Sequence, residues 1–173
     1  MNVLSVFFLD DEKERHLGFK KKVKEVNDDI KKYSYKNLPY SSVEVFYIYD
    51  GEEAKKHLSS STYDVIMLDH DLGFGYNQEI TGYDVCKAIV ENYELHKKSN
   101  FIVHSLNPVG AENMSKILKS YSLNVSVLPY AWLGFKFNNN LNRVMFDKPS
   151  IKEINFDYNF HYDLDDDNYY NLK

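Results

Sequence analysis

Short apolar runs alternate with segments of helical periodicity along most of the chain. Runs that stay apolar at consecutive positions are typical of strands in a parallel sheet, because helices cover both faces of such a sheet. We predict five strands of this kind, at residues 3–9, 43–49, 64–68, 101–103 and 125–128.

Four segments between these runs have the spacing of amphipathic helices. In the first, His16 lies one turn before Phe19 on the same stripe. The predicted buried faces are Phe19, Val23, Val26 and Ile30 in the first helix, Gly82, Val85, Cys86 and Ile89 in the third, and Ala111, Met114 and Leu118 in the fourth.

The starts of three helices carry capping signals. Asp11 with Glu14, and Asp50 with Glu53, have the spacing of a capping box. Asn107 is the predicted cap of the fourth helix, and the proline after it suits a first turn, where a missing N–H is tolerated.

Strand and helix alternating in this way predict an α/β fold over residues 1–130, a doubly wound five-stranded parallel sheet with right-handed crossovers. Sheets of this type bind ligands at the carboxyl ends of their strands. Seven polar residues fall at those ends: Asp10, Asp11, Asp69, His70, Asp71, His104 and Ser105.

The pattern changes after Pro129. The stretch "WLGFKFNNNLNRVMF" predicts a hairpin around residues 138–140, and residues 154–164 alternate strictly between apolar and polar positions, as a strand with one buried face does. An acidic tail follows, which we expect to be frayed. Residues 131–173 thus form a predicted β-rich extension that could be a lid, an extra sheet or a dimer contact.

Composition narrows the function classes. A formal net charge of −5 argues against a nucleic-acid binder held mainly by counterion release. The single cysteine, Cys86, forms no internal disulfide and fits a reducing compartment, so we expect a cytoplasmic protein. No apolar run approaches the roughly 20 residues that span a bilayer.

Residues 1–130 resemble the receiver domain of response regulators. The resemblance rests on "FFLDDE" after the first strand, "EVFYIYDGEEAKKHL", "DVIMLDHDLG" and "TGYDVCKAI", in that order. It implies that Asp69 stands at the phosphoacceptor position and that Ser105 stands where receivers keep a Ser or Thr. Receivers also carry a Lys-Pro step after the fifth strand, but here the step is Leu128-Pro129, so the lysine is missing.

Three further stretches, "DDEKERH", "LDHDLG" and "HSLNPVGAENM", are similar to a divergent branch, the cyclic-phosphate processing receiver-like family. This resemblance implies action on, or recognition of, a cyclic phosphate. In the receiver strand order the first, third and fourth strands are neighbours about 4.8 Å apart, so the polar residues at their ends should line one crevice.

The carboxylates at these ends suit a metal ion. Asp10, Asp11 and Asp69 supply hard oxygen ligands, and the receiver resemblance also implies Mg²⁺ there. In the alternative interpretation, Asp11 is only a helix cap and Asp10 a solvated neighbour.

The two histidines form a candidate acid–base pair. Opening a cyclic phosphodiester needs a base for water and an acid for the leaving alkoxide, and His70 and His104 could hold opposite protonation states near neutral pH. Asp71 or Asp69 could fix a ring tautomer. The alternative is that His104 is a half-buried strand residue and His70 a loop residue.

Four more residues are candidates for contacts to phosphate. Arg15 and His16 lie near the strand ends, although His16 could equally be a buried residue of the first helix. Ser105 and Asn107 could donate to phosphate oxygens, next to free N–H groups at a helix start.

Three functions remain open: a phosphoesterase that opens a cyclic nucleotide or a 2′,3′-cyclic phosphate, a non-catalytic binder of a cyclic nucleotide signal, and a degenerate signalling receiver. We lean towards the enzyme. The expected ligand is a cyclic nucleotide or an RNA ending in a cyclic phosphate, with no membrane or duplex DNA as partner. Homo-oligomerisation through the late strand is a further expectation.

Overall fold

A computed structural model describes residues 2–33, 40–73, 80–130, 135–138 and 143–146. Five parallel strands form one sheet in the order β2-β1-β3-β4-β5. Their bounds are β1 Asn2–Leu9, β2 Tyr40–Ile48, β3 Val65–Leu68, β4 Asn100–Val103 and β5 Asn124–Val127. The predicted doubly wound α/β fold is confirmed, with each strand within three residues of its expected bounds.

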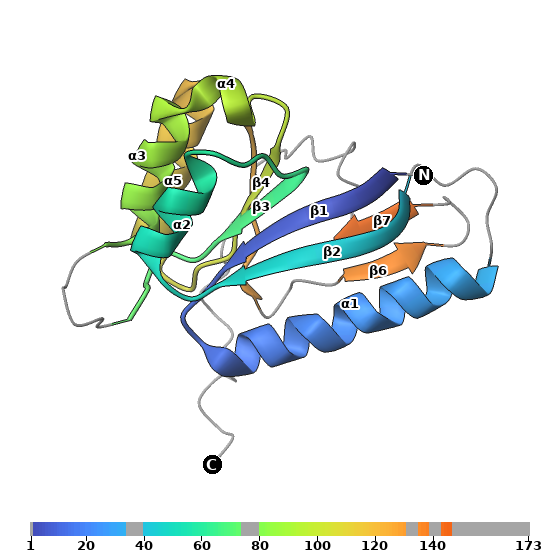
Figure 1. Ribbon diagram of the computed structural model, residues 1–173. Coiled ribbons are helices and arrows are strands. Elements are labelled where there is room, and N and C mark those ends of the chain that lie inside the picture. The colour runs from blue at the N-terminus through green and yellow to red at the C-terminus, as the bar shows by residue number, and fades with distance from the viewer. Residues whose placement is uncertain (1, 34–39, 74–79, 131–134, 139–142, 147–173) are drawn as a thin grey trace, which may run out of the picture.

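The helices divide unequally between the two faces of the sheet (Figure 1). Helix α1 (Lys13–Tyr33) lies on one face, and α2 (Gly51–Leu58), α3 (Gly82–Glu91), the short α4 (Tyr93–His96) and α5 (Pro108–Ser120) lie on the other. The strand order causes this division. The chain steps from β1 to β2 in one direction and then always in the opposite direction, and right-handed crossovers place the two sets of helices on opposite faces.

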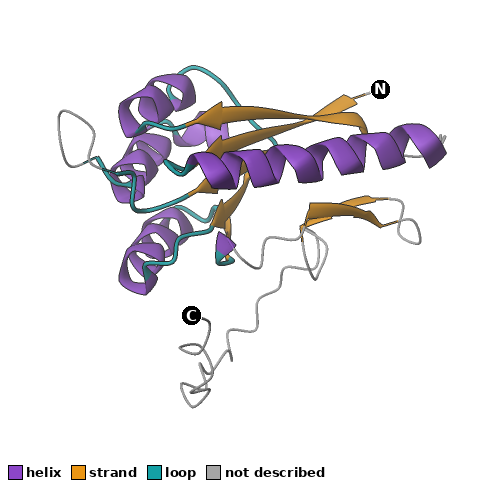
Figure 2. Ribbon diagram, turned by 90° about the horizontal axis from the view of Figure 1, so that it is seen from below, coloured by secondary structure: helices purple, strands orange, loops and turns teal. Residues whose placement is uncertain are grey.

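A hairpin occupies part of the α1 face. Strands β6 (Phe135–Asn138) and β7 (Arg143–Phe146) pair antiparallel, and β6 lies beside α1, as the view from below shows (Figure 2). The predicted hairpin is confirmed. The predicted strand at 154–164, its proposed oligomer contact and the acidic tail lie outside the described residues.

Alternate residues of each strand enter two separate cores. In β1, Leu4, Val6 and Phe8 face the α1 side, whereas Phe7 and Leu9 face α2, α3 and α5. The predicted buried faces of the first, third and fourth helices are confirmed, because all their residues are buried.

Two of the three predicted caps are confirmed. Asp50 accepts a hydrogen bond from the Glu53 N–H, and Asn107 accepts one from the Gly110 N–H. At α1 the expectation for Asp11 was wrong. The carboxylate of Asp10 accepts the Glu12 N–H at 2.8 Å, while Asp11 turns towards Gly73, whose φ of +58° and missing side chain leave room for it.

Within the part of the chain that the structure describes, no helix combines the length and the apolar character needed to cross a bilayer.

Candidate functional site

The register of the sheet brings three polar residues side by side at its carboxyl edge. Leu9, Leu68 and Val103 are aligned across β1, β3 and β4, and the ladder continues as Asp69 N–H bonds to the Leu9 carbonyl and His104 N–H to the Leu68 carbonyl. Asp10, Asp69 and His104 are the next residues of these strands. They continue the alternation that points towards α1, and all three are buried.

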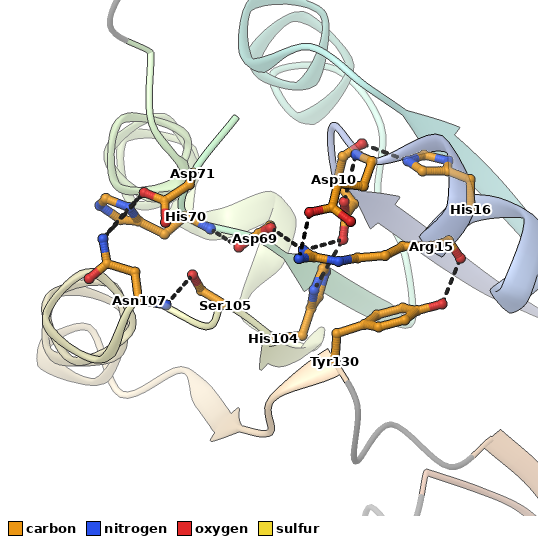
Figure 3. A network of polar contacts seen from close by, with 11 residues as sticks. Asp10, Arg15, His16, Asp69, His70, Asp71, His104, Ser105, Asn107 and Tyr130 are labelled. Atoms are coloured by element: carbon orange, nitrogen blue, oxygen red, sulfur yellow. Dashed lines mark hydrogen bonds and ion pairs between the residues drawn. The ribbon is translucent and has the colours of Figure 1, made fainter. Parts of the chain in front are cut away.

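Their side chains converge with Arg15, and we call Asp10, Asp69, His104 and Arg15 the inner cluster (Figure 3). One carboxylate oxygen of each aspartate and a ring nitrogen of His104 lie within 4.8 Å of one another. Arg15 Nη1 lies 3.2 Å from Asp10 Oδ2 and 2.7 Å from Asp69 Oδ2. The guanidinium therefore neutralises part of the charge of two buried carboxylates.

Burial shifts the protonation of this cluster. It raises the pKa of Asp10 to about 6, although hydrogen bonding to Glu12 and the charge of Arg15 act in the opposite direction. Burial and the nearby Arg15 charge lower the pKa of His104 to about 3, so this imidazole is neutral at physiological pH. A neutral imidazole has one lone pair for a ligand, and the N–H that it keeps is a much weaker acid than an imidazolium N–H.

His104 sits between aromatic rings. It stacks on Phe8 with 5.1 Å between ring centroids, and Tyr130 packs edge-on at 6.2 Å. Its Nδ1 is 3.6 Å from Asp10 Oδ2, beyond hydrogen-bond distance, and neither ring nitrogen has a hydrogen-bond partner among the described residues.

His16 and Tyr130 contact the main chain of two inner-cluster residues. His16 Nε2 lies 2.6 Å from the Asp10 carbonyl oxygen, and its ring stacks on Tyr49 at 3.7 Å. The Tyr130 hydroxyl donates to the Arg15 carbonyl at 2.7 Å, and its ring lies 5.5 Å from the guanidinium. His16 thus fixes the Asp10 main chain, and Tyr130, which the sequence analysis missed, fixes that of Arg15.

His70, Asp71 and Asn107 lie on the other side of Asp69, and we call them the outer cluster (Figure 3). His70 Nδ1 is 2.7 Å from Asp71 Oδ1, which also accepts from Asn107 Nδ2 at 3.2 Å. Burial acts to raise the pKa of Asp71, but these two hydrogen bonds together with the nearby charges, including that of Arg15, lower it overall. The His70 ring packs against Gly110, where a Cβ would come within 2.4 Å of it.

A cavity of about 620 Å³ opens at this edge of the sheet. Its lining combines carboxylates and Arg15 with apolar side chains: Asp11, Glu12, Arg15, Asp69, Asp71, Leu72, Gly73, Ile80, Thr81 and Leu106. Asp69 belongs to both the inner cluster and this wall, so the cavity gives a ligand access to the inner cluster.

The structure brings some candidate residues together and separates others. Asp10 and Asp69 meet as expected, but Asp11 lines the cavity outside the group of three converging donors. His70 and His104 lie on opposite sides of Asp69 (Figure 3), because they occupy strand positions of opposite parity. Ser105 accepts the Asn107 N–H and lines a second cavity against α5.

The chain is similar to known proteins in sequence and in fold. A sequence model for the cyclic-phosphate processing receiver domain matches residues 6–120. No curated protein matches the chain. The signal receiver domain of a putative Luxo repressor protein from Vibrio parahaemolyticus is similar, at 19% identity over 75% of this chain and 78% of that chain, with a TM-score of 0.49. A CheY-like response regulator receiver domain from Methylobacillus flagellatus is similar at 14% identity over 74% and 86%, with a TM-score of 0.47.

Proposed function

The chain belongs to the family of cyclic-phosphate processing receiver domains, and from this premise we propose that it opens a cyclic phosphodiester at the carboxyl edge of the sheet. One observation carries the proposal. A buried group of metal-type donors includes Asp69, a partly exposed His–Asp pair follows it directly in the chain, and Asp69 and Asp71 line one cavity.

His70 is the proposed proton-transfer group. Its Nδ1 faces Asp71 at 2.7 Å, so a proton on Nδ1 is held by the carboxylate and the Nε2 lone pair is free to take a proton from water. Asn107 donates to the same carboxylate oxygen and so restrains Asp71. We therefore assign Asn107 and Asp71 to the positioning of His70.

His104 does not fit the acid half of the predicted pair. It is fully buried, neutral, and on the far side of Asp69 from His70. The proton for the leaving alkoxide must then come from His70 after it has acted as base, or from water. We assign His104 to ligand binding with the two carboxylates.

The charge of the cavity favours a bound cation. Among the residues described, its wall carries four carboxylates, those of Asp11, Glu12, Asp69 and Asp71, and one arginine, so it would repel an anionic phosphodiester. Asp10 and Asp69 have the donor chemistry to hold a divalent cation, as the Mg²⁺ expectation supposed. When bound, such an ion supplies charge stabilisation for a phosphoryl oxygen.

Arg15 is the proposed second contact for phosphate. Its guanidinium lines the cavity and carries two terminal nitrogens in a fork that matches phosphate oxygens. Ser105 and the helix start after Asn107 are weaker candidates for phosphate contacts. The Ser105 oxygen already accepts the Asn107 N–H, and the Gly110 N–H already donates to the Asn107 side chain.

The test is a panel of cyclic mono-, di- and oligonucleotides and RNA with a 2′,3′-cyclic phosphate end, followed by chromatography for breakdown and calorimetry for binding. We expect one class to be opened. His70→Gln and Asp71→Asn should each lower turnover, the former by about 10²-fold or more, with folding intact by circular dichroism. The exposed His57→Gln on α2 is the matched control and should be fully active.

Two other outcomes would refute the proposal. A ligand that binds tightly and is recovered unchanged would identify a non-catalytic binding module. A stable beryllofluoride adduct on Asp69 would favour the signalling receiver. Against that alternative, both oxygens of Asp69 are engaged, Oδ2 by Arg15 and Oδ1 by the His70 N–H at 2.7 Å.

A further inference from the structure

His104 presents an unused donor to the inner cluster. Its side chain is 0% exposed, and neither ring nitrogen makes a hydrogen bond within the described chain. A buried polar atom without a partner is rare in native proteins and calls for an explanation such as an ion. Nδ1 faces the Asp10 carboxylate at 3.6 Å, so the unused donor is directed into the carboxylate pair.

The three donors are spaced for a single ion. Donors about 2.1 Å from one metal lie within about 4.2 Å of one another. Here one nitrogen and two carboxylate oxygens already lie within 4.8 Å, so small side-chain shifts would complete the set. Imidazole nitrogen favours the later first-row transition metals, whereas Mg²⁺ favours oxygen ligands and retained water.

Arg15 occupies the position that the ion would need. Its Nη1 contacts one carboxylate oxygen of each aspartate, Asp10 Oδ2 and Asp69 Oδ2. A divalent ion would balance these two carboxylates completely, whereas the guanidinium balances only one charge. Nη2 is bonded to Glu12 at 2.8 Å, and Glu12 lines the cavity, so a released guanidinium stays at the cavity wall.

We propose that Asp10, Asp69 and His104 bind a divalent first-row transition-metal ion in preference to Mg²⁺, and that the ion displaces the Arg15 guanidinium towards the cavity. This deepens the proposed function at the same site. It also gives Arg15 two positions: in the metal-free protein it neutralises the carboxylates, and in the metal-bound protein it faces a ligand phosphate.

Metal binding alone tests the inference. Calorimetry on the full chain with Co²⁺, Mn²⁺ and Mg²⁺ should give Co²⁺ an affinity at least about 10-fold above that of Mg²⁺. Electron paramagnetic resonance of bound Cu²⁺ should show hyperfine coupling to nitrogen, which identifies an imidazole ligand directly.

Variants assign the binding to these residues. His104→Phe keeps a ring on Phe8 and removes both nitrogens, so it should abolish the nitrogen coupling and the preference for Co²⁺ over Mg²⁺. Arg15→Gln removes the competing cation and should raise the affinity for every divalent ion by about 10-fold. His96→Phe is the matched control, because His96 is also buried with an unpartnered Nδ1 but lies against the Leu58 carbonyl, away from the cluster.

Several results would overturn the inference: equal affinity for Mg²⁺ and Co²⁺, nitrogen coupling that persists in His104→Phe, or weaker metal binding by Arg15→Gln. If His104→Phe does not fold, the coupling in the wild-type protein and the Arg15→Gln affinities still decide it. If the protein selects Co²⁺ over Mg²⁺ but opens no cyclic phosphate, this inference stands and the proposed function is refuted. If it opens a cyclic phosphate without that metal selectivity, the proposed function stands and this inference is refuted.

Discussion

The inner and outer clusters use the same kinds of residue in opposite environments. In the inner cluster the side chains of Asp10 and His104 are 0% exposed, and only Asp69 and Arg15 reach the cavity. The outer cluster lies nearer the surface, with side chains of His70 and Asp71 that are 17% and 64% exposed. Burial lowers the pKa of the inner histidine and makes it a neutral donor, whereas the outer histidine is partly exposed and is held by Asp71.

The parity of strand positions produces this difference. Asp69 and His104 continue the side of the sheet that faces α1, and His70 and Ser105 continue the side that faces α5. One step along a strand reverses the face, so neighbours in sequence enter separate environments. Two histidines at adjacent strand ends are therefore not automatically partners.

Arg15→Met should have the largest effect on stability. It leaves two buried carboxylates without their cation, which we expect to lower the free energy of unfolding by about 3–5 kcal/mol at pH 7. Urea denaturation measures it. Lys13→Met, at an exposed position two residues before Arg15 on α1, removes the same charge and should change stability by less than about 0.5 kcal/mol. Equal effects in the two variants would show that the inner cluster is not electrostatically coupled.

The pH dependence of stability should become steeper in His104→Phe. In the wild-type protein, the lowered pKa of His104 gives stability that is present above pH 6.5 and lost as pH falls towards about 3. Asp10 acts in the opposite direction. Its raised pKa makes the folded state take up a proton first, so stability rises as pH falls from about 6 to 3.8, by up to about 3 kcal/mol.

Without the histidine only the Asp10 contribution remains in the inner cluster. His104→Phe should therefore gain stability as pH falls from about 6 to 3.8, a window in which the opposite contributions of His104 and Asp10 nearly cancel in the wild-type protein. Thermal unfolding at a series of pH values measures both slopes. Parallel slopes in the two proteins would contradict the assignment of a neutral His104.

Gly110→Ala should affect the outer cluster alone. The new Cβ would meet the His70 ring at 2.4 Å, so the ring must move away from Asp71. We expect a loss of about 1–3 kcal/mol and weaker turnover, while divalent metal affinity stays unchanged. Loss of metal binding in this variant would show that the two clusters are not independent.

Asp71→Asn should have the smallest effect on stability, below about 1 kcal/mol, because the Asp71 side chain that contacts His70 is largely exposed to water. Denaturant titration at pH 6 and 8 measures it. A loss above about 2 kcal/mol would mean that Asp71 supports the fold and not only the orientation of His70.

The sequence predicted much of this fold because its signals are local. Apolar runs gave the strands, Asp50 and Asn107 gave two helix starts, and the stripe from Phe19 to Ile30 gave the buried face of α1. The predicted cap at Asp11 was wrong because the carboxylate of Asp10, the first residue after β1, accepts the Glu12 N–H. Tyr130 was missed because nothing near it in the chain indicates that it packs on Arg15, 115 residues away.

The sequence by itself determined which residues reach the carboxyl edge, since apolar runs end where the polar residues begin. It also determined which face of the sheet each of these residues continues, because successive strand residues alternate between the two faces, and this alternation separates His70 from His104. Only the tertiary structure decided their chemistry. The register that aligns Asp10, Asp69 and His104, the burial that neutralises the histidine and the entry of Arg15 from α1 all depend on contacts between distant segments, because desolvation and charge pairing are properties of the packed protein.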